Sequence, residues 1–166
     1  MRVANLDGRA VLLGDTRALD IAEASDGRFP SDPQRVYAVW SELAAWAEGL
    51  PVDERPGAVA IDRARLGPPV PRPAQILAVG LNYAEHAREF GLAIPDDPLV
   101  FTKFASSLVG PEAVVRLSGP RVDWEAELVV VIGDGGRDIP ADRAWERIAG
   151  LTIGQDISDR DVQWWG

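Results

Sequence analysis

The sequence has no cysteine and only one histidine and one methionine among its 166 residues. Without cysteine there can be no disulfide, no thiolate nucleophile and no zinc–thiolate cluster. The first residues, Met1–Ala4, begin neither a signal peptide nor a transmembrane segment, and no serine stands in a G-x-S-x-G motif. We therefore predict a cytoplasmic protein that is neither membrane-bound nor a serine or cysteine hydrolase.

Basic residues are also scarce. The chain carries 17 Lys and Arg against 26 Asp and Glu, which gives a net charge of −9, and its pI is near 4.6. No basic stripe interrupts this acidity, so phosphate backbones and anionic membrane surfaces are repelled. Nucleic acid and membranes are excluded as expected partners. The length permits one substantial core with a small appended lobe.

The N-terminal part has a hairpin signal followed by a helix signal. Two short apolar segments flank Asp7-Gly8, a pair that favours the positive φ angles of a type I′ turn. From Pro33 to Gly49 apolar residues recur at helical spacing, which predicts an amphipathic helix. The tryptophans of this helix are assigned to core packing and to no chemistry.

Prolines crowd the segment from Leu50 to Gln75, where neither a helix nor a central strand can persist. We place a boundary here, between a small lobe with its linker (1–74) and a second region (75–166). Asn82 is expected to cap a short helix that Gly91 ends. In the second region we predict strands at 76–79, 99–103, 122–132 and 151–155, and a further helix at 141–148.

The apolar strand predicted at 122–132 contains the most informative pattern, because Glu125 and Glu127 project from the same face of it. Burying unpaired carboxylates is costly, so a cation is expected between them. Asp156, just after the next apolar run, would add a third oxygen ligand. Mg²⁺ or Mn²⁺ suits such a set, with Ca²⁺ as a further candidate. The alternative is a solvent-facing strand face that is simply acidic.

His86 and Glu89 are three residues apart in the predicted short helix, so both side chains share one face. The carboxylate would orient the imidazole, and the other ring nitrogen would take a proton from water as a general base. The alternative is a lone surface histidine. A helix this short is unstable alone and must dock on the core or be ordered by a ligand.

Four segments of the chain resemble signature segments of the fumarylacetoacetate hydrolase family, in the same order and spacing. They are 80–89 (G-x-N-Y-x-x-H-x-x-E), 101–111 (F-x-K, then S-S and G-P), 123–133 (D-x-E-x-E-L-x-x-V-I-G) and 154–163 (G-x-D-x-S-x-R-D-x-Q). The chain thus resembles the N-terminal part of a bacterial-type member. Residues 1–74 resemble the variable N-terminal region only loosely.

The resemblance implies an α+β fold: a β-rich mixed roll or sandwich core, incomplete at the C-terminus, with a small N-terminal α/β lobe. It also implies a divalent-metal-dependent hydrolase that cleaves a carbon–carbon bond in acylpyruvate or fumarylpyruvate-type 2-oxo acids, as in aromatic catabolism. Decarboxylation or isomerisation of related 2-oxo acids fits the same motifs.

The resemblance also assigns roles to individual residues. Glu125, Glu127 and Asp156 would hold the metal, with His86 and Glu89 catalytic on a segment that closes over the substrate. Lys103 and Gln163 would bind substrate; the alternatives are a solvated lysine and a buried, hydrogen-bonded glutamine. Asp123 shares the strand face of Glu125 and Glu127, so we expect it to support the metal ligands. For Arg160 and Asp161 we expect ion pairs that fix a turn.

Members of the family usually continue for about a hundred further residues, so the resemblance implies a chain that ends within the catalytic domain. A longer parent would form a homodimer. The alternative to an enzyme is therefore a non-catalytic partial domain that needs a partner chain. The adjacent Trp164 and Trp165 would present an apolar surface, which we expect another segment or chain to cover.

Overall fold

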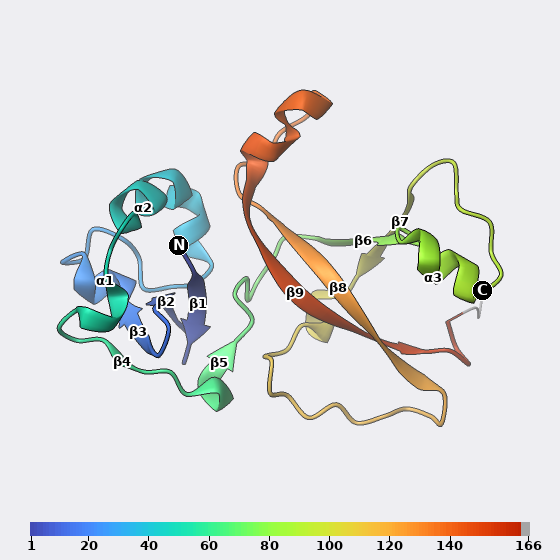
Figure 1. The fold of residues 1–166 in the computed structure, drawn as a ribbon, viewed down its shortest axis with the longest axis horizontal. Helices are drawn as coiled ribbons and strands as arrows, with labels where there is room; N and C mark the ends of the chain where they lie inside the picture. Colours follow the sequence, from blue (N-terminus) through green and yellow to red (C-terminus); the bar gives the residue numbers. More distant parts are fainter. Residues whose placement is uncertain (164–166) are drawn as a thin grey trace.

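The computed structural model describes residues 1–163, and the expectation for Trp164 and Trp165 lies outside this range. The N-terminal lobe lies on one side, and a short and a long antiparallel ribbon with a short helix lie on the other (Figure 1). The architecture is mixed α and β, with a curled arrangement of strands in the second region, which confirms the predicted α+β class.

The lobe is built on a five-stranded antiparallel sheet in the order β4-β3-β2-β1-β5. The predicted hairpin is confirmed, since Asp7 and Gly8 join β1 to β2 with φ angles of 50° and 78°. Positive φ at both turn positions matches the twist of the flanking strands. The strands are β1 (Val3–Leu6), β2 (Arg9–Leu13), β3 (Arg17–Asp20), β4 (Val59–Ala60) and β5 (Leu66–Gly67).

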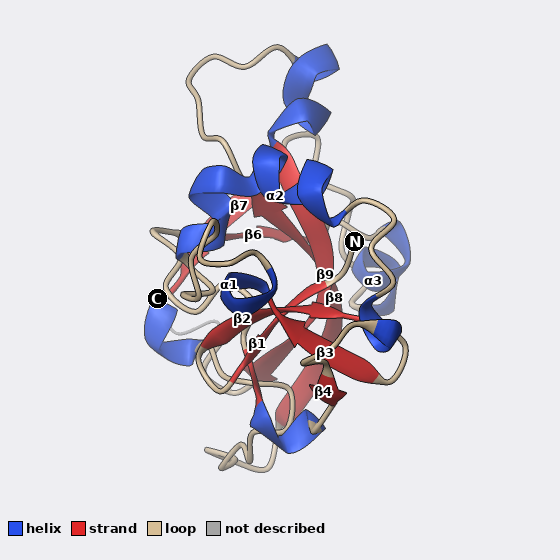
Figure 2. Cartoon of the chain, turned by 90° about the vertical axis from the view of Figure 1, so that its left-hand side faces the viewer, coloured by secondary structure: helices blue, strands red, loops and turns tan. Residues whose placement is uncertain are grey.

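Both faces of β2 are buried. Ala10 and Leu12 face the helical layer, formed by α1 (Ile21–Ala24) and α2 (Trp40–Ala47), whose buried side chains include Ile21 and Leu43. Val11 lies in a second cluster on the other face of the sheet. Figure 2 shows α1 and α2 lying over the strands of the lobe. This pair of clusters gives the lobe its own hydrophobic core.

The second region begins with an antiparallel ribbon of β6 (Ile76–Gly80) and β7 (Leu99–Lys103). Between these strands the chain forms α3 (Ala84–Glu89), whose C-cap residue is Phe90; the predicted stop residue, Gly91, follows with a φ of 66°. The N-cap residue is Tyr83 and not the predicted Asn82, because Leu81 takes a left-handed φ of 52° and delays the helix start.

The second ribbon pairs β8 (Val122–Ile132) with β9 (Ile148–Asp159) over almost their whole length. β9 is longer than the strand predicted at 151–155. One face of the ribbon carries the acidic residues of β8, and the other carries large apolar side chains. The apolar face comprises Trp124, Leu128, Val130, Ile132, Leu151, Ile153 and Ile157, all of them at least 40% exposed.

Two predicted helices contain 3₁₀ helix in place of α-helix. The one predicted from Pro33 begins with a 3₁₀ turn at Arg35–Val39 before α2, and the one predicted at 141–148 is 3₁₀ throughout, at Ala141–Arg147. Further 3₁₀ turns lie at Val52–Glu54, Arg63–Arg65 and Ala105–Ser107. Within residues 1–163 no helix has the length and apolar character needed to cross a membrane.

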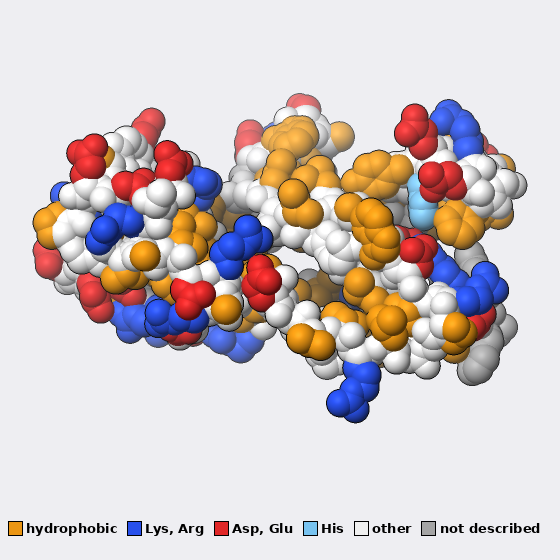
Figure 3. Space-filling view, turned by 60° about the horizontal axis from the view of Figure 1, so that its bottom comes forward, with side chains coloured by type: hydrophobic (Ala, Val, Ile, Leu, Met, Phe, Trp, Pro, Cys, Tyr) orange, Lys and Arg blue, Asp and Glu red, His pale blue; other side chains and the backbone are white. Residues whose placement is uncertain are grey.

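Hydrophobic side chains are distributed unevenly between the two regions. Figure 3 shows them gathered on the surface of the part that contains the ribbons. Among residues 1–163, every buried apolar side chain except Ala87 belongs to the first 58 residues. The proline-rich linker is held to the lobe, since the Tyr37 hydroxyl donates to the Pro69 carbonyl at 3.1 Å and Arg72 pairs with Asp32 at 2.6 Å.

Candidate metal and acid–base site

The three carboxylates predicted as metal ligands lie together. The ribbon register places Glu125 directly opposite Asp156, and Glu127 lies two residues along the same face. Glu125, Glu127 and Asp156 each offer an oxygen atom, and these atoms all lie within 4.8 Å of one another. The side chains of Glu125 and Asp156 are less than one-fifth exposed. The geometry therefore offers a compact set of three oxygen ligands.

Glu127 is the least compensated member of this cluster. Burial raises the pKa of its carboxyl group, and the neighbouring charges of Glu125 and Asp156 raise it further. His86 and Lys103 oppose these effects only in part. A divalent cation between the three carboxylates would remove this repulsion.

Lys103, at the end of β7, pairs with Asp156 through its ammonium group. The contact brings the two ribbons together, because β7 belongs to the first ribbon and Asp156 to the second. The sequence interpretation assigned Lys103 to a substrate group and did not anticipate this pair. An ammonium group has three donors, so binding Asp156 leaves others for a substrate oxygen.

His86 reaches the acidic cluster from α3. Its Nε2 lies 3.4 Å from Oε1 of Glu125, and its Nδ1 lies 3.6 Å from Oε2 of Glu89. The predicted shared face of His86 and Glu89 is therefore present, although the Glu89 carboxylate is 74% exposed. The histidine lies between an orienting carboxylate and the three-carboxylate set.

Arg160 makes contacts that the sequence interpretation did not anticipate, since it does more than fix a turn. Its guanidinium lies 2.7 Å from Glu125 and 2.9 Å from Asp123, and its side chain is only 11% exposed. It also donates to Oε1 of Gln163 at 3.1 Å. Asp161 pairs instead with Arg121, at 3.3 Å.

Asp123 supports the site through Arg160 and does not belong to the three-carboxylate set. The Arg160 guanidinium and the backbone N–H of Trp124 lower the pKa of the Asp123 carboxyl. A sequence signal for Arg160 did exist, because it follows β9 and is four residues beyond Asp156. Its reach to Glu125 depends on the pairing of Val122 with Asp159, which the sequence does not give.

The charges of the cluster suit a dication. Four carboxylates, those of Asp123, Glu125, Glu127 and Asp156, face two permanent cations, one ammonium and one guanidinium group. Carboxylates therefore outnumber permanent cations in this cluster, which favours an added cation. All-oxygen ligands also suit Mg²⁺ and Mn²⁺. The residues therefore fit the metal that the resemblance implied.

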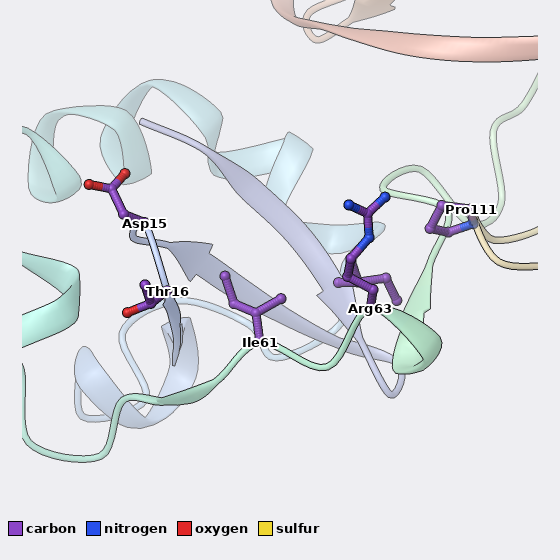
Figure 4. Close-up of a pocket in the computed structure, with 6 residues that line it drawn as sticks. Asp15, Thr16, Ile61, Arg63 and Pro111 are labelled. Atoms are coloured by element: carbon purple, nitrogen blue, oxygen red, sulfur yellow. The ribbon is translucent and has the colours of Figure 1, made fainter.

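A surface depression with a volume of about 430 Å³ lies away from this cluster and is lined mainly by residues of the lobe. Asp15, Thr16, Ile61, Arg63 and Pro111 line it, together with Leu66 (Figure 4). Its two charged side chains are already paired, Asp15 with Arg2 and Arg63 with Glu112. We assign the depression no part in the chemistry.

Comparison with known families places this fold and site. The family model described as "Fumarylacetoacetate (FAA) hydrolase C-terminal" matches residues 75–166, which is more than half of the chain. The chain belongs to the fumarylacetoacetate hydrolase family, as the four sequence motifs indicated. Relatives found by the comparisons are named as tautomerases, isomerases and hydrolases.

Three known proteins illustrate the similarity. The chain is 46% identical over 97 residues to the human protein named "Oxaloacetate tautomerase FAHD2A, mitochondrial", a match covering 57% of this chain and 31% of the relative. A putative HpcE protein from Mycobacterium smegmatis is 48% identical, with a TM-score of 0.84 over all of this chain and 58% of that one.

The third is the maleylpyruvate hydrolase of Sphingobium sp. SYK-6, solved with manganese(II) and pyruvate. It is 26% identical with a TM-score of 0.72, covering 96% of this chain and 60% of that one. The chain spans about a third of the length of the curated relative and less than two-thirds of these solved neighbours. The mitochondrial name of the human relative gives no support to the predicted cytoplasmic location.

Proposed function

We propose that this protein is a divalent-metal-dependent hydrolase that cleaves a carbon–carbon bond in acylpyruvate or fumarylpyruvate-type 2-oxo acids. The observation that carries this proposal is the meeting of Glu125, Glu127 and Asp156 within 4.8 Å, beside His86. The bound manganese and pyruvate named for the Sphingobium neighbour support the metal and the 2-oxo acid class.

The three carboxylates would hold Mg²⁺ or Mn²⁺, or alternatively Ca²⁺. When bound, the ion would polarise the 2-oxo and carboxylate oxygens of the substrate and stabilise the negative charge that develops as the bond breaks. Glu125 and Asp156 are oriented for this by their ion pairs with Arg160 and Lys103.

His86 would take a proton from water at one ring nitrogen, while Glu89 orients the ring and stabilises its cation. Lys103 would use its remaining donors on a substrate carboxylate or enolate oxygen. Gln163, whose side-chain oxygen accepts from Arg160, would offer its amide N–H groups as a neutral hydrogen-bond donor.

A second candidate, isomerisation or decarboxylation of a related 2-oxo acid, is favoured by the name of the human relative, a tautomerase. Isomerisation would use the same proton-accepting histidine and the same stabilised enolate and would release no pyruvate, whereas decarboxylation would release carbon dioxide and could itself leave pyruvate. Measuring both pyruvate and carbon dioxide therefore separates these activities from hydrolysis.

A partial domain that needs a partner chain is the non-enzymatic alternative, and the exposed apolar face of the β8–β9 ribbon is consistent with it. For a longer parent we propose a homodimer. Sedimentation of the 166-residue chain at several concentrations distinguishes a monomer from an assembly. Titration with a divalent metal tests the site independently of the oligomeric state.

The test of the hydrolase proposal is pyruvate release from a panel of acylpyruvates, with and without Mn²⁺. We expect release only with metal, and a loss of about 10²–10⁴-fold in His86→Asn. Mn²⁺ affinity should change by less than about threefold in this variant, because the carboxylates remain. Equal release by the wild type and His86→Asn would contradict the proposal. Consumption of the enol without pyruvate would favour the tautomerase.

A further inference from the structure

Helix α3 touches the β8–β9 ribbon at two points, and both converge on Glu125. The first point is His86, whose Nε2 lies 3.4 Å from Oε1 of Glu125. The second is Phe90, the residue that ends the helix, whose ring lies 5.4 Å from the guanidinium carbon of Arg160. Arg160 in turn lies 2.7 Å from the same Oε1 atom.

These contacts form a closed ring of four residues. The imidazole of His86 meets the ring of Phe90 edge to face, with centroids 5.0 Å apart and an interplanar angle of 75°. Phe90 meets Arg160, Arg160 meets Glu125, and Glu125 meets His86. Each member is thus held by two others, and two of them belong to the helix.

Arg160 is suited to this place because a guanidinium can stack on an aromatic ring and hydrogen-bond in its own plane at the same time. Its in-plane nitrogen atoms bind Asp123, Glu125 and Gln163. Its position is fixed by these partners, and its face is left for Phe90. A lysine would keep the positive charge but would lose the planar stacking surface and the paired donors.

We propose that Arg160 is a positioning residue that docks α3 on the ribbon through Phe90 and thereby places His86 beside Glu125. The helix is only six residues long, so its position depends on such contacts more than on its own hydrogen bonds. The inference rests on the proposed function in one respect: that function explains why His86 should lie beside Glu125. The docking itself requires neither metal nor substrate.

Hydrogen exchange of the α3 amides tests the docking directly on the whole metal-free chain. The reporters are the amides of Ala87, Phe90 and Leu92, which donate to Tyr83, His86 and Ala87 respectively. We expect Arg160→Lys and Phe90→Leu each to speed exchange at these amides by about threefold to tenfold, the scale of one cation–π contact. The double variant should be no faster than the faster single variant, because both changes break the same contact.

Arg143→Lys is the matched control. Arg143 is also an arginine in an ion pair, with Glu146 at 3.0 Å, but it lies in the 3₁₀ turn between β8 and β9 and outside the ring of contacts. This variant should leave exchange in α3 unchanged.

A second readout follows the imidazole itself. His86 is the only histidine of the chain, so its ring NMR signal needs no further assignment. At fixed pH this signal should shift in Arg160→Lys and stay in place in Arg143→Lys.

Three results would overturn the proposal: unchanged α3 exchange in Arg160→Lys, additive effects in the double variant, or faster exchange throughout the β8–β9 ribbon in Phe90→Leu. The last would mean that Phe90 supports the ribbon and not the helix. Since these readouts need no turnover, failure of the proposed hydrolase activity would leave them intact.

Discussion

The two regions of the molecule differ in which side chains they bury. In the lobe, apolar side chains of the sheet and helices are buried, as Leu12, Ile21 and Leu43 illustrate with 2% exposure or less. In the second region the apolar side chains of the ribbons are exposed, and the well-covered groups are charged. Buried apolar side chains are thus concentrated in the lobe, whereas the candidate site lies in the ribbons.

In the part of the chain that the structure describes, strand register and ion pairs position the candidate site, and few buried apolar side chains lie beneath it. Long antiparallel pairing sets the positions of Glu125, Glu127 and Asp156, and ion pairs with Lys103 and Arg160 tie the ribbons and α3 together. A two-stranded ribbon is only marginally stable alone, so these polar contacts carry more of the organisation than they would in the lobe.

The largest expected effect comes from two identical substitutions, one in each region. Leu43→Ala removes a fully buried side chain and should cost about 2–5 kcal/mol of unfolding free energy, because it leaves a cavity. Leu128→Ala removes a side chain that is 58% exposed and should cost less than about 1 kcal/mol. Chemical denaturation of both variants measures the difference. Equal costs would remove the distinction between the regions.

A smaller effect is expected at the carboxylate that fixes the turn between β2 and β3. Asp53 accepts hydrogen bonds from the backbone N–H groups of Asp15, Thr16 and Arg17 and from the Thr16 hydroxyl. These bonds, led by those from Asp15 and Thr16, lower the pKa of the Asp53 carboxyl from 3.8 to about 2. Its ionised form therefore stabilises the fold.

Asp53→Asn tests this contribution through its pH dependence. The stabilisation is fully present above the ordinary pKa of 3.8 and is lost as the pH falls through about 2. The variant should therefore melt below wild type at neutral pH, and the two melting curves should converge toward pH 2. A difference that stays constant over this pH range would contradict the charge-based explanation.

The smallest expected effect is at Glu127 in the candidate site, where, in contrast to Asp53, the ionised carboxylate destabilises the fold. The pKa of the Glu127 carboxyl is raised in the folded chain, so its protonated form stabilises the fold. This stabilisation is fully present below the ordinary pKa of 4.5 and is lost as the pH rises through the pKa of the folded chain. In a chelator at neutral pH, Glu127→Gln should therefore raise the melting temperature by a few degrees at most.

Added Mn²⁺ should reverse the order of the two melting temperatures. Mn²⁺ should stabilise the wild type and have little effect on Glu127→Gln, because binding to the native state adds stability by mass action. Thermal unfolding with and without Mn²⁺ measures both signs. A variant less stable than wild type in the chelator would contradict the repulsion inferred at Glu127.

Features fixed by local periodicity were predictable from the sequence. The alternation of a strand sufficed to place Glu125 and Glu127 on one face, and Asp7-Gly8 sufficed for the first hairpin. The contacts of Arg160 were not predictable, because they depend on the exact register of β8 with β9 and on a long side chain reaching back across it. The cap of α3 was also missed, since the positive φ of Leu81 has no signal in residue type.

The central claim is that Glu125, Glu127 and Asp156 bind one divalent cation, and calorimetric titration of the metal-free chain with Mn²⁺ tests it most directly. We predict binding at a single site, strengthened by oxalate as a mimic of the 2-oxo acid enolate. Glu125→Gln, Glu127→Gln and Asp156→Asn should each weaken binding by about a hundredfold or more. Failure of the folded wild-type chain to bind Mn²⁺, or wild-type affinity in all three variants, would contradict the claim.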